Sequence, residues 1–249
     1  MKTLVWVLAC VMFFSCKQKQ SADGVAKPDD NRFTPVVLTQ TGDFDEPMNF
    51  EVLKDGRVYV NERKGVLKVY DPITKMVKVV GTIPVNTKYT SAEGVVTEAE
   101  EGFIGFTLDP NFDENSYAYF FYAHPTEKKD VLSRWEIKND KLVQGSEKVL
   151  LEISTQREIC CHPGGGMTWD KDKDLYITVG NNTGNVADKS QTDERPNRTS
   201  WDDQRGSGTP MTCGEKFFVF IRRKMALTAF PMATCLQKVL LKRGRRSML

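Results

Sequence analysis

The sequence has few of the residues that are typical of collagen-like, low-complexity or zinc-binding proteins. Its 249 residues include only 18 glycines and 11 prolines, too few for a collagen-like or low-complexity chain. Histidine occurs twice and cysteine six times, with no Cys-x-x-Cys pair or other zinc-ligand spacing. No apolar run after the N-terminus is long enough to cross a bilayer. The 40% of hydrophobic and 27% of charged residues indicate a folded chain with a sizeable core.

The N-terminus has the pattern of an export signal. Lys2 precedes an apolar run over 4–14 that ends at Ser15 and Cys16, which is typical of a bacterial lipoprotein signal peptide. We expect residues 1–16 to be the signal, Cys16 to be lipidated and anchored to a membrane, and 17–34 to be a polar tether. Cleavage at Cys10, or an ordinary signal peptide cut elsewhere, remains open. Globomycin treatment that left the precursor unchanged would contradict the lipoprotein prediction.

Export places the chain where disulfides form. Cys160 and Cys161 are the only cysteines in the main body of the sequence. They either form a vicinal disulfide or remain two unpaired cysteines, and the sequence favours neither.

Short alternating segments separated by turn-forming residues begin at Phe50. Four strands are expected in about thirty residues: 51–54, 57–60, 66–70 and 76–80. Three turns containing Asp-Gly, Lys-Gly and Asp-Pro separate them, and no amphipathic helix of useful length lies between them. This part of the sequence therefore indicates an all-β fold.

A weak internal repeat extends this pattern. An apolar residue, an Asp-rich turn and a strand containing tyrosine recur from Leu53, Leu108 and Trp169, at intervals of 55 and 61 residues. Four-stranded units at this period are typical of a β-propeller, with a two-sheet sandwich as the alternative. Residues 35–208 hold about three units, whereas propellers close with at least four. The sequence therefore predicts an incomplete propeller.

The two histidines differ in their surroundings. His124 follows a predicted strand, and we expect it to be an ordinary loop residue. His162 lies between two predicted strands and precedes three glycines, which allow a ligand to approach the backbone closely. A histidine on such a loop can act as a general base. The spacing alone favours neither a functional nor a purely structural role for His162.

Three segments resemble the pyrroloquinoline-quinone-dependent glucose/sorbosone dehydrogenase family, which includes soluble aldose sugar dehydrogenases. Residues 55–70 resemble its opening blade. Residues 100–112, Glu-Glu-Gly-Phe-Ile-Gly-Phe-Thr-Leu-Asp-Pro-Asn-Phe, resemble its segment of the pattern Gln/Glu-x-Gly-Leu/Phe-Leu/Ile-Gly, which ends in Pro-x-Phe. Residues 161–180 resemble its His-x-Gly-Gly loop and the strand that follows. The resemblance covers about residues 35–208.

The resemblance implies a six-bladed propeller that binds pyrroloquinoline quinone and calcium. His162 would be the base that takes a proton from the C1 hydroxyl of an aldose while hydride passes to the quinone. Glu100 stands where many members have a glutamine near the quinone. Asn181 stands where members have an aspartate that supports the protonated histidine. The family's quinone-holding cations and calcium loop belong to its second half, so no metal ligand is expected in this chain.

These residues predict an exported quinoprotein oxidoreductase acting on aldoses, truncated and inactive as this chain. Binding of the quinone and calcium by the chain alone is correspondingly in doubt. The alternative is a non-catalytic exported module that binds carbohydrate or protein, in which partial blades pair with another chain. The sequence does not specify the sugar, the electron acceptor or the oligomeric state.

The C-terminal segment 209–249 differs from the rest. It carries nine basic residues and one acid, a charge of +8, whereas the chain as a whole is +2. Such a segment can contact nucleic acid or an anionic membrane. Export argues against nucleic acid, and we expect no nucleic-acid partner. The tail is expected to be disordered or partly helical.

The resemblance offers another origin for the tail. Family members continue with a segment such as Asn-Thr-Asn-Asp-Leu-Arg-Gly-Lys-Ile, which AAC ACC AAT GAC TTG CGG GGA AAA ATT C encodes. Reading from the second base gives Thr-Pro-Met-Thr-Cys-Gly-Glu-Lys-Phe, identical to residues 209–217. The tail is therefore predicted to be out of frame, with a basic helix starting near Arg222 as the alternative. Sequencing the gene tests this, because propeller strands should lie in the other frame downstream.

Overall fold

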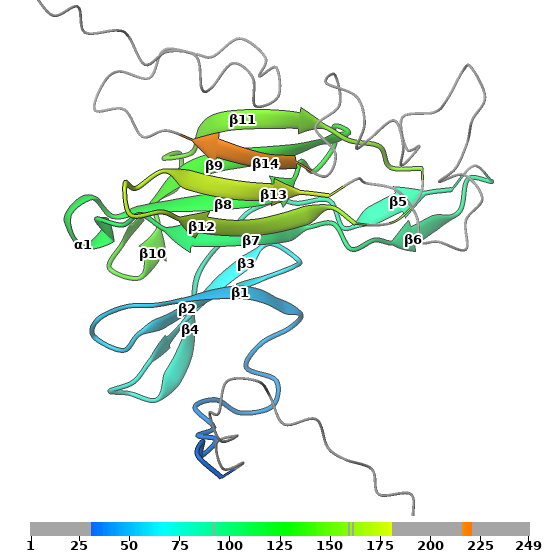
Figure 1. Cartoon of the computed structure of the whole chain (residues 1–249). Coiled ribbons are helices and arrows are strands. Elements are labelled where there is room, and N and C mark those ends of the chain that lie inside the picture. The colour runs from blue at the N-terminus through cyan, green and yellow to red at the C-terminus, as the bar shows by residue number, and fades with distance from the viewer. Residues whose placement is uncertain (1–30, 92, 159, 161, 181–215, 221–249) are drawn as a thin grey trace, which may run out of the picture. The chain divides into compact units, whose positions relative to one another are not determined.

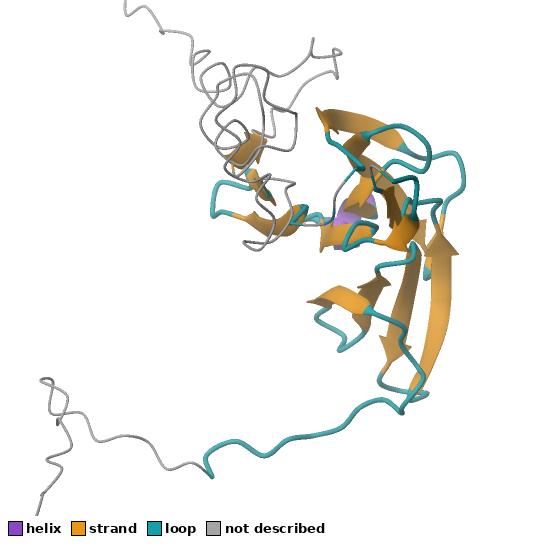
Figure 2. Ribbon diagram, turned by 90° about the vertical axis from the view of Figure 1, so that its right-hand side faces the viewer, coloured by secondary structure: helices purple, strands orange, loops and turns teal. Residues whose placement is uncertain are grey.

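The computed structural model describes residues 31–91, 93–158, 160, 162–180 and 216–220. The chain divides into two compact units, Met1–Val37 and Leu38–Leu249. All described strands belong to the second unit, together with one four-residue helix, α1 (Phe112–Asn115). Figures 1 and 2 show this predominance of strands, which confirms the predicted all-β class.

The first sheet is a four-stranded antiparallel meander in the order β1-β2-β3-β4. Its strands are β1 (Pro47–Val52), β2 (Val58–Glu62), β3 (Val66–Asp71) and β4 (Met76–Thr82). The four strands expected from the alternating pattern are therefore present. Turns at Gly56 and Gly65, both with positive φ, connect β1 to β2 and β2 to β3.

The second sheet is larger and follows a short hairpin of β5 (Lys88–Thr90) and β6 (Val96–Glu98). It has the order β10-β9-β8-β7, with β11 also pairing with β9. Its strands are β7 (Phe103–Leu108), β8 (Tyr117–Ala123), β9 (Lys129–Lys138), β10 (Lys141–Leu142) and β11 (Lys148–Ser154).

The third sheet has the order β12-β13-β14. It contains β12 (Gly164–Trp169), β13 (Leu175–Val179) and β14 (Lys216–Phe220). β14 belongs to the basic tail that was expected to be disordered or helical, yet it pairs antiparallel with β13 along five residues. The remainder of the tail lies outside the described residues, and its out-of-frame origin stays a prediction.

Two hydrophobic cores lie on opposite faces of the second sheet. One packs Phe103, Phe106 and Phe120 against residues of the first sheet, with the Phe103 and Phe120 ring centroids 4.7 Å apart. The other packs Ile104 and Phe121 against residues of the third sheet. All six residues of β7 are buried because both faces of this strand are covered. β7 is therefore fixed from both sides.

Buried polar groups also tie β7 to its neighbours. The Asn61 side chain is fully buried, and its Nδ2 donates to the Phe103 carbonyl at 2.7 Å. From the other side, Trp169 Nε1 donates to the Leu108 carbonyl at 2.9 Å. Leaving such groups without partners costs about 1–3 kcal/mol each. The Asn61 bond holds the start of β7, next to the segment before Phe103, and the Trp169 bond holds its end.

Candidate functional site

The loop between β11 and β12 carries His162. This histidine is exposed, and its backbone lies in the left-handed region with φ +59°. Its backbone N–H donates to Glu100 Oε2 at 3.2 Å. The structure thus brings together two of the predicted site residues, 62 positions apart, although their predicted chemical roles stay predictions.

Gly180 allows the histidine loop to pack against the end of β13. A Cβ atom at this position would lie 1.7 Å from the His162 carbonyl oxygen. Gly180 N–H also donates to the Pro163 carbonyl at 3.1 Å. Any side chain here would clash with the His162 carbonyl, which is a physical reason for glycine at the end of the family-like segment.

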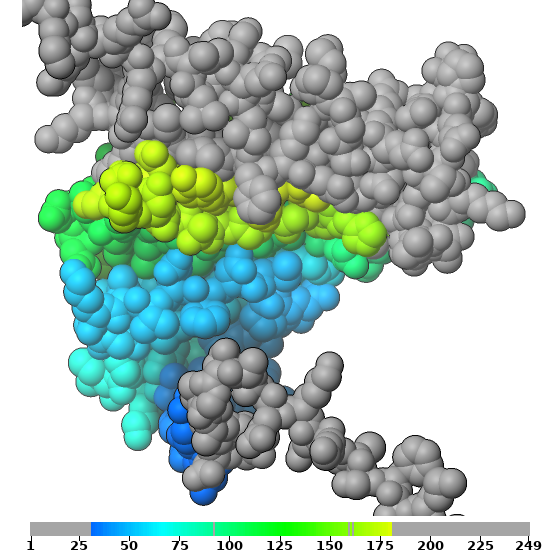
Figure 3. All heavy atoms as spheres, viewed as in Figure 1, coloured from blue at the N-terminus to red at the C-terminus, as the bar shows by residue number. Residues whose placement is uncertain are grey.

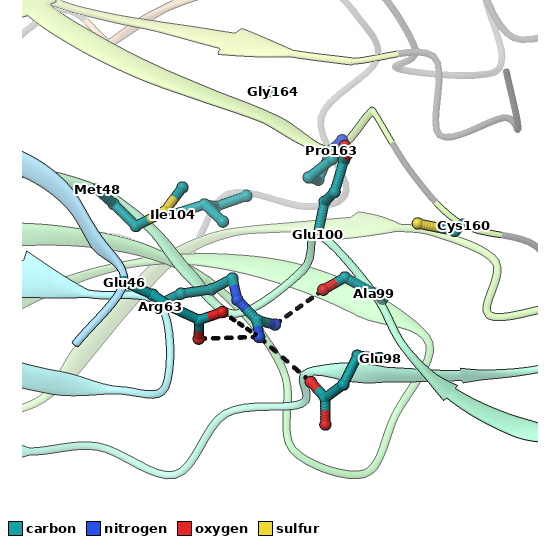
Figure 4. A pocket seen from close by; sticks show the side chains of 10 residues that line it. All are labelled: Glu46, Met48, Arg63, Glu98, Ala99, Glu100, Ile104, Cys160, Pro163 and Gly164. Carbon is teal, nitrogen blue, oxygen red and sulfur yellow. Dashed lines mark hydrogen bonds and ion pairs between the residues drawn. The ribbon is translucent and has the colours of Figure 1, made fainter.

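A cavity of about 640 Å³ lies beside this loop (Figure 4). Its lining comes from four parts of the chain: the start of β1, the turn between β2 and β3, the segment from the end of β6 into β7, and the loop before β12. The lining residues are Glu46, Met48, Arg63, Glu98, Ala99, Glu100, Ile104, Cys160, Pro163 and Gly164. His162 is not among them, although Pro163 and Gly164 directly follow it. The histidine therefore stands next to the cavity.

Arg63 is largely buried and holds the cavity wall together. Its Nη1 donates to the Ala99 carbonyl at 2.8 Å, and its Nη2 donates to Glu46 and Glu98 carboxylates at 3.0–3.2 Å. Hydrogen bonding from Arg63 lowers the pKa of Glu46 below its ordinary value. Glu46 is therefore ionised at neutral pH, and the guanidinium is already engaged by protein groups.

Next to the cavity lies a buried charged cluster of Glu101, Asp130 and Arg157. Arg157 Nε is 3.3 Å from Glu101 Oε2, and both side chains are at least nine-tenths buried. Burial raises the pKa of Glu101, opposed by Asn86 and Arg157. Burial, with repulsion from Glu101, raises the pKa of Asp130 well above its ordinary value. The cluster therefore favours a protonated Asp130 beside the Glu101–Arg157 pair.

The described residues do not fit the expected quinone on their own. Pyrroloquinoline quinone carries three carboxylates, which require cationic partners. Among the described residues lining the cavity, Arg63 is the one cation, and it is paired with Glu46 and Glu98. Glu100 adds a further carboxylate. No group of three or more metal-ligating side chains occurs in the described parts of the chain.

Several predicted residues fall outside the described part of the chain. These are Cys10, Cys16, Cys161 and Asn181. Cys160 is disulfide-bonded, but its partner lies among the residues that are not described, so the vicinal pairing stays a prediction. Within the described residues, no helix has the length and hydropathy needed to span a membrane.

Solved structures with a similar fold are sugar dehydrogenases. The PQQ-bound aldose sugar dehydrogenase of Streptomyces coelicolor is 17% identical, with a TM-score of 0.51 over 71% of this chain and 44% of its own. The apo soluble aldose sugar dehydrogenase of Escherichia coli is 14% identical, with the same TM-score and coverage. Both are β-propellers, so the predicted incomplete propeller of about three blades is confirmed.

Sequence comparison leads to the same family. An uncharacterized protein of Synechocystis sp. is 26% identical over 139 residues, which are 55% of this chain and 33% of that protein. The chain thus spans a third of this curated relative and less than half of the two solved structures. Residues 44–198 match the family described as glucose/sorbosone dehydrogenase. Because this match covers more than half of the sequence, the chain belongs to the glucose/sorbosone dehydrogenase family.

Proposed function

We propose that this chain supplies the proton-accepting side of a site that oxidises the C1 hydroxyl of aldose sugars, with pyrroloquinoline quinone and calcium as cofactors. The observation that carries the proposal is His162, exposed beside a cavity and held through its backbone by Glu100. Family membership and the PQQ-bound Streptomyces coelicolor neighbour support the reaction class. The described residues do not by themselves supply the groups that would hold these cofactors.

The cavity has the chemistry of a sugar site. The carboxylates of Glu46, Glu98 and Glu100 are acceptors for sugar hydroxyls, and charged acceptors form the stronger hydrogen bonds. Met48 and Ile104 provide apolar surface for the C–H faces of a sugar ring. Histidine is the most frequent general base in enzymes. His162 would take the hydroxyl proton at the edge of this cavity, and its anchored backbone would limit the positions of the imidazole.

Reconstitution and binding measurements test the proposal. With pyrroloquinoline quinone, calcium and an aldose, we expect no dye reduction by this chain alone, because the described cavity offers the quinone no free cation. Aldose binding, followed by saturation-transfer NMR, should persist and should weaken roughly tenfold in Glu100→Gln through loss of a charged acceptor. His124→Ala, on a different loop, is the matched control.

Two results would contradict parts of this proposal. Dye reduction that is lost in His162→Ala would show that the chain alone forms a complete site. Absence of aldose binding would count against the sugar site.

The non-catalytic alternative is favoured by one observation. Met48, Phe50 and Val52 alternate along β1 and are 41%, 68% and 59% exposed, and Figure 3 shows the side chains of this strand on the surface. Adjacent exposed apolar side chains are typical of an interaction surface. Gel filtration separates the two cases, because a defined oligomer supports a module that pairs with other chains. A monomer would remove the support for this alternative.

We also propose that the chain is an exported lipoprotein anchored through Cys16. The apolar run before Cys16 and the polar tether after it support this location. Mass spectrometry of the mature N-terminus tests it, and an unmodified N-terminus beyond Cys16 would contradict it.

A further inference from the structure

Two consecutive glutamates hold the histidine loop at two points. Glu100 is exposed and accepts the backbone N–H of His162 at 3.2 Å. Glu101 is buried and pairs with Arg157 at 3.3 Å. Both contacts are made by the short segment before β7, and both reach the loop between β11 and β12. Because Glu100 and Glu101 are neighbours in the sequence, one short segment holds the loop at both His162 and Arg157.

Arg157 connects this loop to three other parts of the fold. Its Nη2 donates to the His124 carbonyl, directly after β8. Its own carbonyl accepts the N–H of Thr90 at 2.9 Å, at the end of β5. Glu101 is additionally held by Asn86 Nδ2 at 3.0 Å. Arg157 thus fixes the loop against elements that are separate in the sequence.

We propose that Arg157, paired with Glu101, is a positioning residue that determines where His162 stands beside the cavity. This inference rests on the proposed function of His162 as the base. Arg157 acts through the loop backbone and touches neither the cavity nor the imidazole in the described contacts. Its planar guanidinium suits the role, because Nη2 donates to the His124 carbonyl while Nε lies within ion-pair distance of the Glu101 carboxylate.

A second ion pair on the same loop provides a matched control. Lys128 Nζ is 2.7 Å from Glu158 Oε1, and both side chains are about half exposed. Exposed pairs of this kind contribute little to stability. Glu158 is adjacent to Arg157 in sequence, so Glu158→Gln removes a charge and an ion pair at nearly the same place. We expect this variant to leave His162 undisturbed.

Selective labelling makes the position of His162 directly measurable. The chain has two histidines, so protein labelled with ¹⁵N-histidine gives two backbone amide signals, and His124→Asn assigns them. The His162 signal reports its hydrogen bond to Glu100. Glu100→Gln should shift this signal upfield and leave the His124 signal in place, which calibrates the measurement.

Two variants then test Arg157. Arg157→Lys keeps the charge but lacks the forked geometry. The double variant Glu101→Gln/Arg157→Met removes both charges together, so neither partner is left as an unpaired buried charge and we expect the chain to fold. In each, we expect an upfield shift of the His162 amide and exchange with water roughly tenfold faster, as for loss of a hydrogen bond to a charged group. The Arg157→Lys effect should be the smaller.

A purely structural role gives a different result. If both variants melt at lower temperature while the His162 amide keeps its shift and exchange rate, the positioning proposal is overturned. A movement of this amide in Glu158→Gln as large as in Arg157→Lys would overturn it as well. The readout does not need turnover or bound sugar, so absence of aldose binding would count against the proposed function alone.

Discussion

Replacing Gly102 with alanine is expected to lower the free energy of unfolding by about 3–5 kcal/mol, from backbone strain and overpacking together. Gly102 has φ +146°, a conformation that only glycine adopts readily. A Cβ atom there would lie 2.2 Å from the Arg63 carbonyl oxygen. That oxygen accepts the Phe103 N–H at 2.7 Å, so relief of the clash would break a bond that joins the first two sheets.

Gly94 provides the matched control for this substitution. It also has positive φ, +80°, but a Cβ atom there would meet nothing within 4 Å. Gly94→Ala should therefore cost only about 1–2 kcal/mol, the ordinary penalty of a left-handed residue. Urea denaturation of both variants measures the difference. Equal losses would mean that the close approach of Arg63 does not constrain position 102.

The repeat in the sequence corresponds to a real structural equivalence. The recurring strands after Leu53, Leu108 and Trp169 are β2, β8 and β13, which are the second strands of the three sheets. Local signals sufficed here because turn residues and two-residue alternation are properties of short segments. The same signals placed the strands of the first sheet within a few residues of their observed bounds.

The strands that the sequence did not predict, β14 and the β5–β6 hairpin, depend on pairing with another strand. β14 lies in a basic tail, yet Lys-Phe-Phe-Val-Phe over 216–220 has the β-branched and aromatic residues that strands favour. Antiparallel pairing with the edge of β13 stabilises this segment as a strand. The β5–β6 hairpin was also not expected, since each of its strands has only three residues.

The charged residues around the site were the least predictable from sequence. Arg63, Glu101 and Arg157 lie in polar stretches that are typical of solvated loops, yet each is largely buried. Their partners are distant in the sequence: Arg157 and Glu101 are 56 positions apart. The glycine-rich loop singled out His162 without deciding its role, and only the resemblance identified Glu100. Their contact depends on two loops from different sheets. These charged side chains can be buried because each is paired with a residue distant in the sequence. Such pairs cannot be recognised from a single sequence.

Asp130 gives the prediction with the clearest dependence on pH. We expect Asp130→Asn to raise the melting temperature at pH 8 and to have little effect near pH 4. The residue lies on β9 with 2% of its surface exposed, and its Oδ1 has no hydrogen-bond partner. Asparagine has nearly the same size and carries no charge, so the substitution removes ionisation with little change in packing.

The sign follows from the direction of the pKa shift. Burial, reinforced by Glu101, raises the pKa of Asp130 in the folded state, and Arg157 opposes this only in part. The folded protein therefore retains a proton that the unfolded chain releases once the pH exceeds the ordinary aspartate pKa. The stabilisation is complete below that value and is lost progressively as the pH rises toward the folded-state pKa. Asparagine has no proton to lose, so its advantage should grow over the same range.

Thermal melts of both proteins between pH 4 and pH 8 measure this effect. Glu152→Gln is the control: its exposed carboxylate, paired with Lys129 at 2.7 Å, lies on the neighbouring strand β11. Removing an exposed pair should change the free energy of unfolding by no more than about 1 kcal/mol. A gap between Asp130→Asn and the parent that stays constant across the pH range would mean that Asp130 ionises normally. In that case the Glu101–Arg157 pair would lie near a second full negative charge, and burial would not suppress the ionisation of Asp130.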